Sequence, residues 1–233
     1  MIISASKLKT YSSCGRKYYY QYKEKAASEK TIPLIMGTSV HKAIEEGYRG
    51  KHPELVYTQT WQKEIADNNL EHNAKAFSKG MRMVLQYDFS IVPDFIEQYF
   101  EMPFPNKENP IAVVNGYIDQ GFEWGVRDLK TSARKPDQLL LDYDLQFILY
   151  AWAFEQFTGT KPKQLVWHHL DTGEDMVANV LGEEKLEHAI ESIMSLVKAD
   201  ADETFPRHVG FECGWCPFKK VCLGGGTHDV GNS

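Results

Sequence analysis

The sequence has no apolar run of about 18 residues, which is the length that a membrane-spanning helix requires. Its first residues, MIISASKLKTYSS, lack the apolar stretch of a secretory signal peptide. It also lacks the G-x-x-x-x-G-K-[ST] loop with which many nucleotide-driven motors hold phosphate. We therefore expect a cytoplasmic protein that has no membrane partner and no motor of its own.

Basic residues are in the minority, since 26 lysines and arginines stand against 32 aspartates and glutamates. The net charge of −6 argues against binding to nucleic acid through bulk electrostatics. Residues 1–30 are different, because their seven basic side chains outnumber two acidic ones. This segment either grips phosphates and stacks on bases or forms an ordinary amphipathic helix with a solvated face. The aromatic residues interleaved with its charges are Tyr11, Tyr18, Tyr19, Tyr20 and Tyr22.

Cysteine is scarce, and the four cysteines lie at the two ends of the sequence. Cys14 stands alone near the start, whereas the other three follow a C-x2-C-x5-C spacing near the finish, as Cys213, Cys216 and Cys222. Four thiolates suit either zinc or an iron-sulfur cluster, and spacing alone does not choose between them. A shared site would require the two ends of the chain to meet. The alternatives are a C-x-x-C redox pair beside two unrelated cysteines, or disulfides.

The hydrophobic content of 42%, with 12% aromatic residues, is enough for one domain with a full core. We expect this domain to span residues 1–222 and to be followed by a disordered tail, 223–233. The hydrophobic pattern predicts helices over residues 4–23, after Gly37, over most of 54–100, and over 136–157 and 183–199. Thr38 or Ser39 would cap the short helix after Gly37.

Strands are expected between these helices. Residues 111–131 alternate in hydrophobicity around a turn near Phe122, which is typical of a β-hairpin, and KQLVWHHL is a further strand. Strands in the middle of the chain, with helices before, between and after them, predict an α/β (α+β) fold. In such a fold, helices flank a small central mixed β-sheet.

The predicted hairpin would bring Asp119 of its first strand close to Asp128 of its second. Lys130 would share a face with Asp128, and Leu129 would point the other way into the core, because side chains alternate along a strand. Two buried carboxylates repel each other unless a divalent cation neutralises them. Mg²⁺ or Mn²⁺ held there could polarise a phosphodiester and activate a water molecule. The alternative is a surface hairpin with an ordinary ion pair.

Six short motifs occur in the sequence in the order in which a known family has them. They are S-x-S-x-L-x-x-Y-x-x-C (Ser4 to Cys14), G-x-x-x-H (Gly37 to His41), G-x-x-D (Gly116 to Asp119), D-x-K-T (Asp128 to Thr131), Q-x-x-x-Y (Gln146 to Tyr150) and C-x2-C-x5-C (Cys213 to Cys222). Together they resemble the PD-(D/E)XK nuclease superfamily. Within it, they are similar to the RecB-like branch that carries an iron-sulfur cluster, which includes AddB-type nuclease domains and CRISPR-associated RecB-like exonucleases.

The resemblance implies a restriction-endonuclease-like core in which His41, Asp119 and Asp128 bind the catalytic metal, Mg²⁺ or Mn²⁺. It implies that Lys130 assists the nucleophilic water, and that Asp119 and Asp128 take part in catalysis. In the same family pattern, Gln146 and Tyr150 contact the substrate strand or support the lysine, since residues four apart share one helical face.

The resemblance also implies that Cys14, Cys213, Cys216 and Cys222 hold a 4Fe-4S cluster, with zinc as the alternative. One departure from the family is Gly15, which follows the first cysteine where proline is usual. The family also has a glutamate before its G-x-x-D strand. Here that residue is either Glu97 or Glu101.

These implications describe a metal-dependent DNA nuclease, an exonuclease that acts on single-stranded DNA or DNA ends in recombination, repair or phage DNA processing. Such a stand-alone prokaryotic or phage protein would work by itself or beside a separate helicase or recombination protein. One alternative is a catalytically silent DNA-end-binding or adaptor module, against which the intact Asp119, Asp128 and Lys130 argue. The other is a zinc-stapled protein without nuclease activity.

Overall fold

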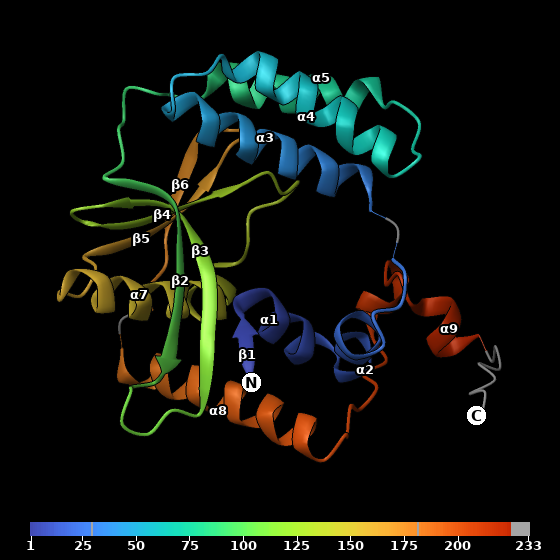
Figure 1. Cartoon of the computed structure of the whole chain (residues 1–233), viewed down its shortest axis with the longest axis vertical. Helices are drawn as coiled ribbons and strands as arrows, with labels where there is room; N and C mark the ends of the chain where they lie inside the picture. The colour runs from blue at the N-terminus through green and yellow to red at the C-terminus, as the bar shows by residue number, and fades with distance from the viewer. Residues whose placement is uncertain (29, 181, 225–233) are drawn as a thin grey trace.

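The computed structural model describes residues 1–28, 30–180 and 182–224, and a six-stranded mixed sheet forms its centre (Figure 1). The strands are β1 (Ile2–Ser4), β2 (Phe95–Phe104), β3 (Ala112–Phe122), β4 (Gly125–Lys130), β5 (Gln164–His169) and β6 (Glu174–Val177). Their order is β1-β3-β4-β5-β6, and β2 also pairs with β3. The predicted α/β fold with a small mixed sheet flanked by helices is confirmed.

The longer helices form two groups, one on each side of the sheet (Figure 1). We call the first group the helical lobe; it consists of α3 (Ile32–Tyr48), α4 (Pro53–Asp67) and α5 (Ala74–Gln86). The second group is α1 (Ala5–Ser13), α7 (Leu145–Thr158) and α8 (Glu183–Ala201). Each group has its own hydrophobic core, since the helical lobe packs on Leu129 and Leu170 while the second group packs on most of the buried sheet residues.

Short helical elements connect these parts. They are α2 (Gly15–Tyr18), a π-helical turn (Tyr19–Lys23), α6 (Gln138–Asp142), a 3-10 turn (Phe211–Gly214) and α9 (Lys219–Leu223). Of the tail expected over residues 223–233, Leu223 still belongs to α9, and residues 225–233 lie outside the described part of the chain. No helix among the described residues combines the length and the apolar character that crossing a membrane would take.

The tyrosines of the N-terminal segment serve packing. Tyr18 is 2% exposed, and Tyr11, Tyr19 and Tyr22 pack against the same core. The ring of Tyr20 lies 5.6 Å from that of Phe218. For these residues, the contacts favour the interpretation as one buried face of an amphipathic segment.

The helix predicted after Gly37 is wrong in its start. It begins at Ile32 with Pro33 in its first turn, a position where the missing N–H of proline costs nothing. Gly37, Thr38 and Ser39 all lie inside this helix, so neither hydroxyl residue caps it. Gly37 packs close to Thr131, although glycine is usually unfavourable inside a helix.

Two other predicted helices also differ from the structure. The stretch 54–100 contains α4 and α5, but residues from Phe95 onward form β2, which pairs with β3 along its length. The helix expected over 136–157 is divided into α6 and α7, because Asp144 caps a new helix by accepting a hydrogen bond from the backbone N–H of Gln146 at 2.8 Å. Gly159 ends α7 in the left-handed conformation, as predicted, with φ of 72°.

Candidate functional site

The site begins where β3 and β4 separate. Their backbone pairing ends at Gln120 and Arg127, so Asp119 and Asp128 are the first residues beyond it. The carboxylate of Asp119 takes the place of a backbone acceptor, because its Oδ2 accepts a hydrogen bond from the backbone N–H of Leu129 at 2.8 Å. The hairpin predicted from the sequence is present, and its fork brings the two aspartates together.

Glu97 joins this fork from the other edge of β3. The pairing of β2 with β3 matches Ile96 with Gln120 and Gln98 with Ile118, which leaves Glu97 opposite Asp119. Glu97 has a φ of 45°. Residues other than glycine rarely adopt this conformation, and it concentrates at functional sites.

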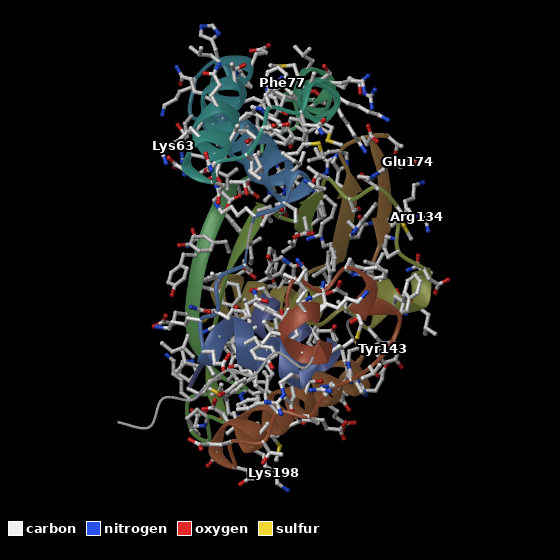
Figure 2. All side chains as sticks on the ribbon, turned by 90° about the vertical axis from the view of Figure 1, so that its right-hand side faces the viewer. Lys63, Phe77, Arg134, Tyr143, Glu174 and Lys198 are labelled. Atoms are coloured by element: carbon white, nitrogen blue, oxygen red, sulfur yellow. The ribbon has the colours of Figure 1, made fainter. Side chains whose placement is uncertain are left out.

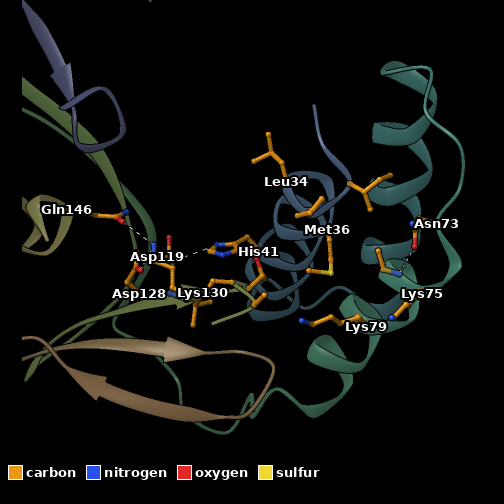
Figure 3. Close-up of a pocket in the computed structure, with 17 residues that line it drawn as sticks. Leu34, Met36, His41, Asn73, Lys75, Lys79, Asp119, Asp128, Lys130 and Gln146 are labelled. Carbon is orange, nitrogen blue, oxygen red and sulfur yellow. Dashed lines mark hydrogen bonds and ion pairs between the residues drawn. The ribbon is translucent and has the colours of Figure 1, made fainter. Parts of the chain in front are cut away.

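His41 of α3 completes a candidate divalent-metal site. One ligand atom from each of His41, Glu97 and Asp119 lies within 4.8 Å of the other two. The Nδ1 atom of His41 is 3.7 Å from Oδ2 of Asp119 (Figure 3). Two carboxylate oxygens and one imidazole nitrogen are a donor set that suits Mn²⁺ well and Mg²⁺ adequately.

Glu97, and not Glu101, is the glutamate of this group. The side chain of Glu101 is exposed and accepts a hydrogen bond from the hydroxyl of Tyr99 at 2.5 Å. Burial, followed by the negative charges of Asp119 and Glu45, raises the pKa of Glu97 to about 8. A carboxyl with such a pKa ionises readily near neutral pH only when a cation joins it.

The glycine of the G-x-x-x-H motif has a steric purpose. Gly37 lies one helical turn before His41 and passes close to Thr131, the residue after Lys130. A Cβ at position 37 would be only 3.0 Å from the Oγ1 atom of Thr131. The glycine therefore lets α3 approach the end of β4, and the histidine one turn later faces Asp119.

Asp128 is the most buried acid of the site, at 1% exposure. Lys130 Nζ lies 2.5 Å from its Oδ2 atom. Apart from this ion pair, neither carboxylate oxygen has a hydrogen-bond partner among the residues that the structure describes. Burial raises the pKa of Asp128 although Lys130 opposes the effect. For Lys130, burial acts to lower the pKa, but Asp128 and Asp119 outweigh it and raise the pKa.

Gln146 and Tyr150 form a chain of hydrogen bonds behind Lys130. Lys130 Nζ donates to Gln146 Oε1 at 3.1 Å, and Gln146 Nε2 donates to the hydroxyl oxygen of Tyr150 at 2.8 Å. Tyr150 in turn donates to the backbone oxygen of Tyr117 at 2.5 Å. Burial keeps the pKa of Tyr150 well above its usual value, so the hydroxyl remains a neutral donor. Of the two expected roles, these contacts favour support of the lysine.

A pocket of about 890 Å³ separates the sheet from the helical lobe (Figure 3). Five of the predicted residues line this pocket, namely Asp119, Asp128 and Lys130 on the sheet, His41 on α3 and Gln146 on α7, whereas Tyr150 is buried. The facing wall, which the sequence did not predict as functional, is formed by Asn73, Lys75 and Lys79 of α5. The two lysines share a helical face, and this spacing was the only signal for them.

The sequence matches the family described as the PD-(D/E)XK nuclease superfamily over residues 2–223. The chain belongs to this superfamily. Within the matched range, Asp119 lies on β3, and Asp128 and Lys130 lie on β4.

Among solved structures, a candidate exonuclease from Eubacterium rectale has a similar fold, with a TM-score of 0.64 and 14% sequence identity. The alignment covers 100% of this chain and 91% of that chain. SSO0001 aligns with 17% identity over 97% of this chain and 88% of its own, with a TM-score of 0.46. No curated protein sequence matches this superfamily member.

All four cysteines line a second, smaller pocket between the N-terminal and C-terminal segments. The backbone N–H of His208 donates to the sulfur of Cys14 at 3.4 Å, and Cys213 donates to the backbone oxygen of His208 at 3.7 Å. None of the four, all of which lie in the described ranges, forms a disulfide. The two ends of the chain therefore meet, as a shared site requires.

Gly15, where the family usually has proline, packs against Pro206. The backbone N–H of Arg16 donates to the oxygen of Pro206 at 3.0 Å. A Cβ at position 15 would lie 2.9 Å from the same oxygen. Glycine at position 15 thus allows the N-terminal segment to approach Pro206 closely.

Proposed function

We propose that this superfamily member is a divalent-metal-dependent deoxyribonuclease, an exonuclease that hydrolyses phosphodiester bonds in single-stranded DNA or at DNA ends. The observation that supports this most directly is the convergence of His41, Glu97, Asp119, Asp128 and Lys130 at one fork of the sheet. A binding module has no need of a buried acid beside a lysine and a three-ligand metal site, so the enzyme is favoured over the silent adaptor.

Each residue of the site would have its own chemical role. His41, Glu97 and Asp119 would hold Mg²⁺ or Mn²⁺, and the neighbouring Asp128 would add a further carboxylate. When bound, the ion polarises a phosphodiester and makes a water molecule more acidic. Lys130, kept protonated by Asp128 and aimed by Gln146, would orient the attacking water or stabilise negative charge on the phosphate. Tyr150 would hold Gln146 in place.

A cleavage assay tests this proposal. We expect Mn²⁺ to support faster degradation of end-labelled single strands than Mg²⁺, because imidazole is a better ligand for Mn²⁺. EDTA should stop the reaction. Circular single strands should resist an exonuclease, whereas their cleavage would identify an endonuclease.

Asp119→Asn is the sharpest variant, because the amide oxygen can still accept the hydrogen bond from Leu129 while the charge is lost. We expect a loss of at least about 100-fold in cleavage rate. Glu101→Gln is the matched control: it changes an acid of the same strand β2 as Glu97 but lies outside the ligand group, and should cleave normally. Full activity of Asp119→Asn would contradict the active-site assignment. DNA binding without cleavage by the unchanged protein would support the adaptor.

We further propose that the four cysteines hold a 4Fe-4S cluster, with zinc as the alternative. Zinc–sulfur bonds of about 2.3 Å in a tetrahedral site bring all four sulfurs within about 4 Å of one another. Among the described residues no three cysteine sulfurs lie within 4.8 Å of one another, so the choice between the cluster and zinc rests on the metal content of the protein. Iron content and absorbance near about 400 nm would support the cluster, and stoichiometric zinc without iron would contradict it.

The proposed setting is the cytoplasm of a prokaryotic or phage-infected cell, in recombination, repair or phage DNA processing. Because the sequence has no phosphate-binding motor loop, a separate helicase or recombination protein would supply unwound strands. Co-purification of the tagged protein with such a partner, in the presence and absence of DNA, tests this part separately. A degradation rate on duplex DNA that matches the rate on single strands would remove the need for a helicase.

A further inference from the structure

A groove of about 680 Å³ runs between the N-terminal segment, the start of α3 and the C-terminal cysteine segment. Figure 1 shows the start of α3 above α2 and α9, which belong to the N-terminal segment and the C-terminal cysteine segment. We call it the lysine groove. The lining residues that matter here are Lys17, Lys30, Leu34, Trp215, Lys219 and Lys220.

The charge of the lysine groove is opposite to that of the whole protein. The chain has a net charge of −6, yet the described lining residues include four lysines and no carboxylate. Lys30 is engaged by Glu64 at 2.7 Å. Lys17, Lys219 and Lys220 form no ion pair within residues 1–28, 30–180 and 182–224, so their ammonium groups are available to a polyanion.

An aromatic platform lies in the same groove. Trp215 is 62% exposed, which is unusual for so large an apolar side chain. Phe211 holds it with a perpendicular ring contact at 4.6 Å between centroids. An exposed indole beside phosphate-binding lysines is the combination with which proteins bind unpaired bases without reading their sequence.

Leu34 connects the lysine groove to the active site. Its side chain, 55% exposed, lines the groove, the 890 Å³ pocket and the hollow that contains Glu97. Figure 3 shows Leu34 on α3, the helix that carries His41. Leu34 is thus an exposed side chain on the shared rim of the lysine groove and of the pocket that contains Asp119.

We propose that the lysine groove guides one unpaired DNA strand to the active site, with Lys17, Lys219 and Lys220 binding phosphates and Trp215 stacking on a base. This inference rests on the proposed nuclease function and adds the path of the substrate. Because stacking on Trp215 requires an unpaired base, the groove selects single strands over duplex.

Binding measurements without divalent metal test the groove directly. For a labelled strand of about 20 nucleotides, Lys219→Ala/Lys220→Ala should weaken binding about tenfold and reduce the slope of log affinity against log salt by about 1.4. Lys63→Ala/Lys198→Ala is the matched control, because it removes two exposed lysines that lie at opposite ends of the molecule (Figure 2). The control should bind normally. Equal affinity and slope for the two double variants would overturn the proposal.

Single substitutions in separate segments guard against a folding artefact. Lys17→Ala should weaken binding although this residue belongs to α2 and lies outside the C-terminal cysteine segment. Trp215→Ala should weaken it about 5- to 100-fold, and Trp215→Phe much less, because phenylalanine still stacks. Iron content and melting temperature should match the unchanged protein. If the lysine and tryptophan variants all bound as tightly as the unchanged protein, or if duplex bound as tightly as single strands, the groove would not be the strand path.

Cleavage of short and long substrates separates the two proposals. The groove variants should raise KM for long single strands while leaving the cleavage of a trinucleotide unchanged, because a substrate that ends inside the active-site pocket does not contact Lys17, Lys219 or Lys220. Equal effects on both lengths would contradict a guiding role. Retained cleavage in Asp119→Asn would instead contradict the nuclease assignment, whatever the groove variants do.

Discussion

At the scale of residues, the fold makes two acids of the site, Glu97 and Asp128, harder to ionise. Burial and neighbouring charges raise the pKa of Glu97 from 4.5 to about 8, and burial also raises that of Asp128 from 3.8. Such a carboxyl binds more protons in the folded chain than in the unfolded chain. The metal-free protein therefore loses stability from these groups as pH rises from about 4 toward 8.

Glu97→Gln should remove the larger of these effects. At pH 8 without metal, the variant should melt at a temperature about 2 °C or more above that of the unchanged protein, because no buried charge has to form. At pH 4 the two should melt nearly alike, since below the ordinary pKa of 4.5 Glu97 is mostly protonated in both the folded and the unfolded chain. Mn²⁺ should stabilise the variant much less, because one ligand is lost. Thermal melts at both pH values, with and without Mn²⁺, provide the measurement. A variant less stable than its parent at pH 8 would contradict the raised pKa.

Lys130→Ala should affect folding as well as catalysis. Asp128 loses its one ion-pair partner, and breaking a buried pair leaves an uncompensated charge. The pKa of Asp128 should rise further, so the loss of unfolding free energy should be small near pH 4, where Asp128 is protonated in the folded chain with or without Lys130, and should grow toward pH 7. Urea unfolding in EDTA at several pH values measures this. A pH-independent loss would show that Asp128 does not carry the charge.

At the scale of elements, the start of α7 joins the N-terminal segment to Lys130. Asp144 caps α7 at the backbone of Gln146 and also pairs with Lys9 of α1 at 2.8 Å. Gln146 then holds Lys130. The cap therefore fixes the position of the amide that aims the lysine.

Asp144→Ala should lower the free energy of unfolding by about 1 kcal/mol, as the loss of a helix cap does. It should also lower kcat about tenfold, because Gln146 loses its fixed place. Asp137→Ala is the matched control, since Asp137 caps the neighbouring α6 through the N–H of Leu139 at 2.9 Å and does not contact the site. It should cost similar stability and leave kcat unchanged. If both variants lowered kcat equally, the effect would come from general destabilisation.

At the scale of the whole molecule, the cysteine pocket joins the two ends of the chain, so that nearly all other residues lie between them. Cys14→Ser should release the proposed cluster, cost about 3 to 5 kcal/mol of stability and weaken the binding of single strands, because the lysine groove is built from both terminal segments. Cys216→Ser should do the same.

The double variant Cys14→Ser/Cys216→Ser tests whether these two cysteines share one centre. If one shared centre joins the ends, the first substitution dismantles it, and the second should add little to the loss of melting temperature or iron. Ser13→Ala, next to the first cysteine, should keep its iron. Additive losses in the double variant, or full iron content in Cys14→Ser, would show that the ends are not joined through a common centre.

The sequence by itself determined the parts whose geometry is local. The alternation of residues 111–131 predicted a hairpin that carries Asp119, Asp128 and Lys130, and the spacing of four predicted that Gln146 and Tyr150 share a face. Both predictions hold because side-chain direction along a strand or helix repeats with a fixed period that distant residues do not alter.

Only the tertiary structure decided which residues from distant parts of the sequence lie beside Asp119, Asp128 and Lys130. The register of β2 against β3 distinguishes Glu97, which lies opposite Asp119, from Glu101. The sequence pattern predicts helix for β2, because this strand is stabilised by pairing with β3, which follows it in the sequence. The lysine groove combines Lys17, Leu34 and Trp215 from three segments. No local pattern marks such a surface, because it exists only where packing brings separate parts of the chain together.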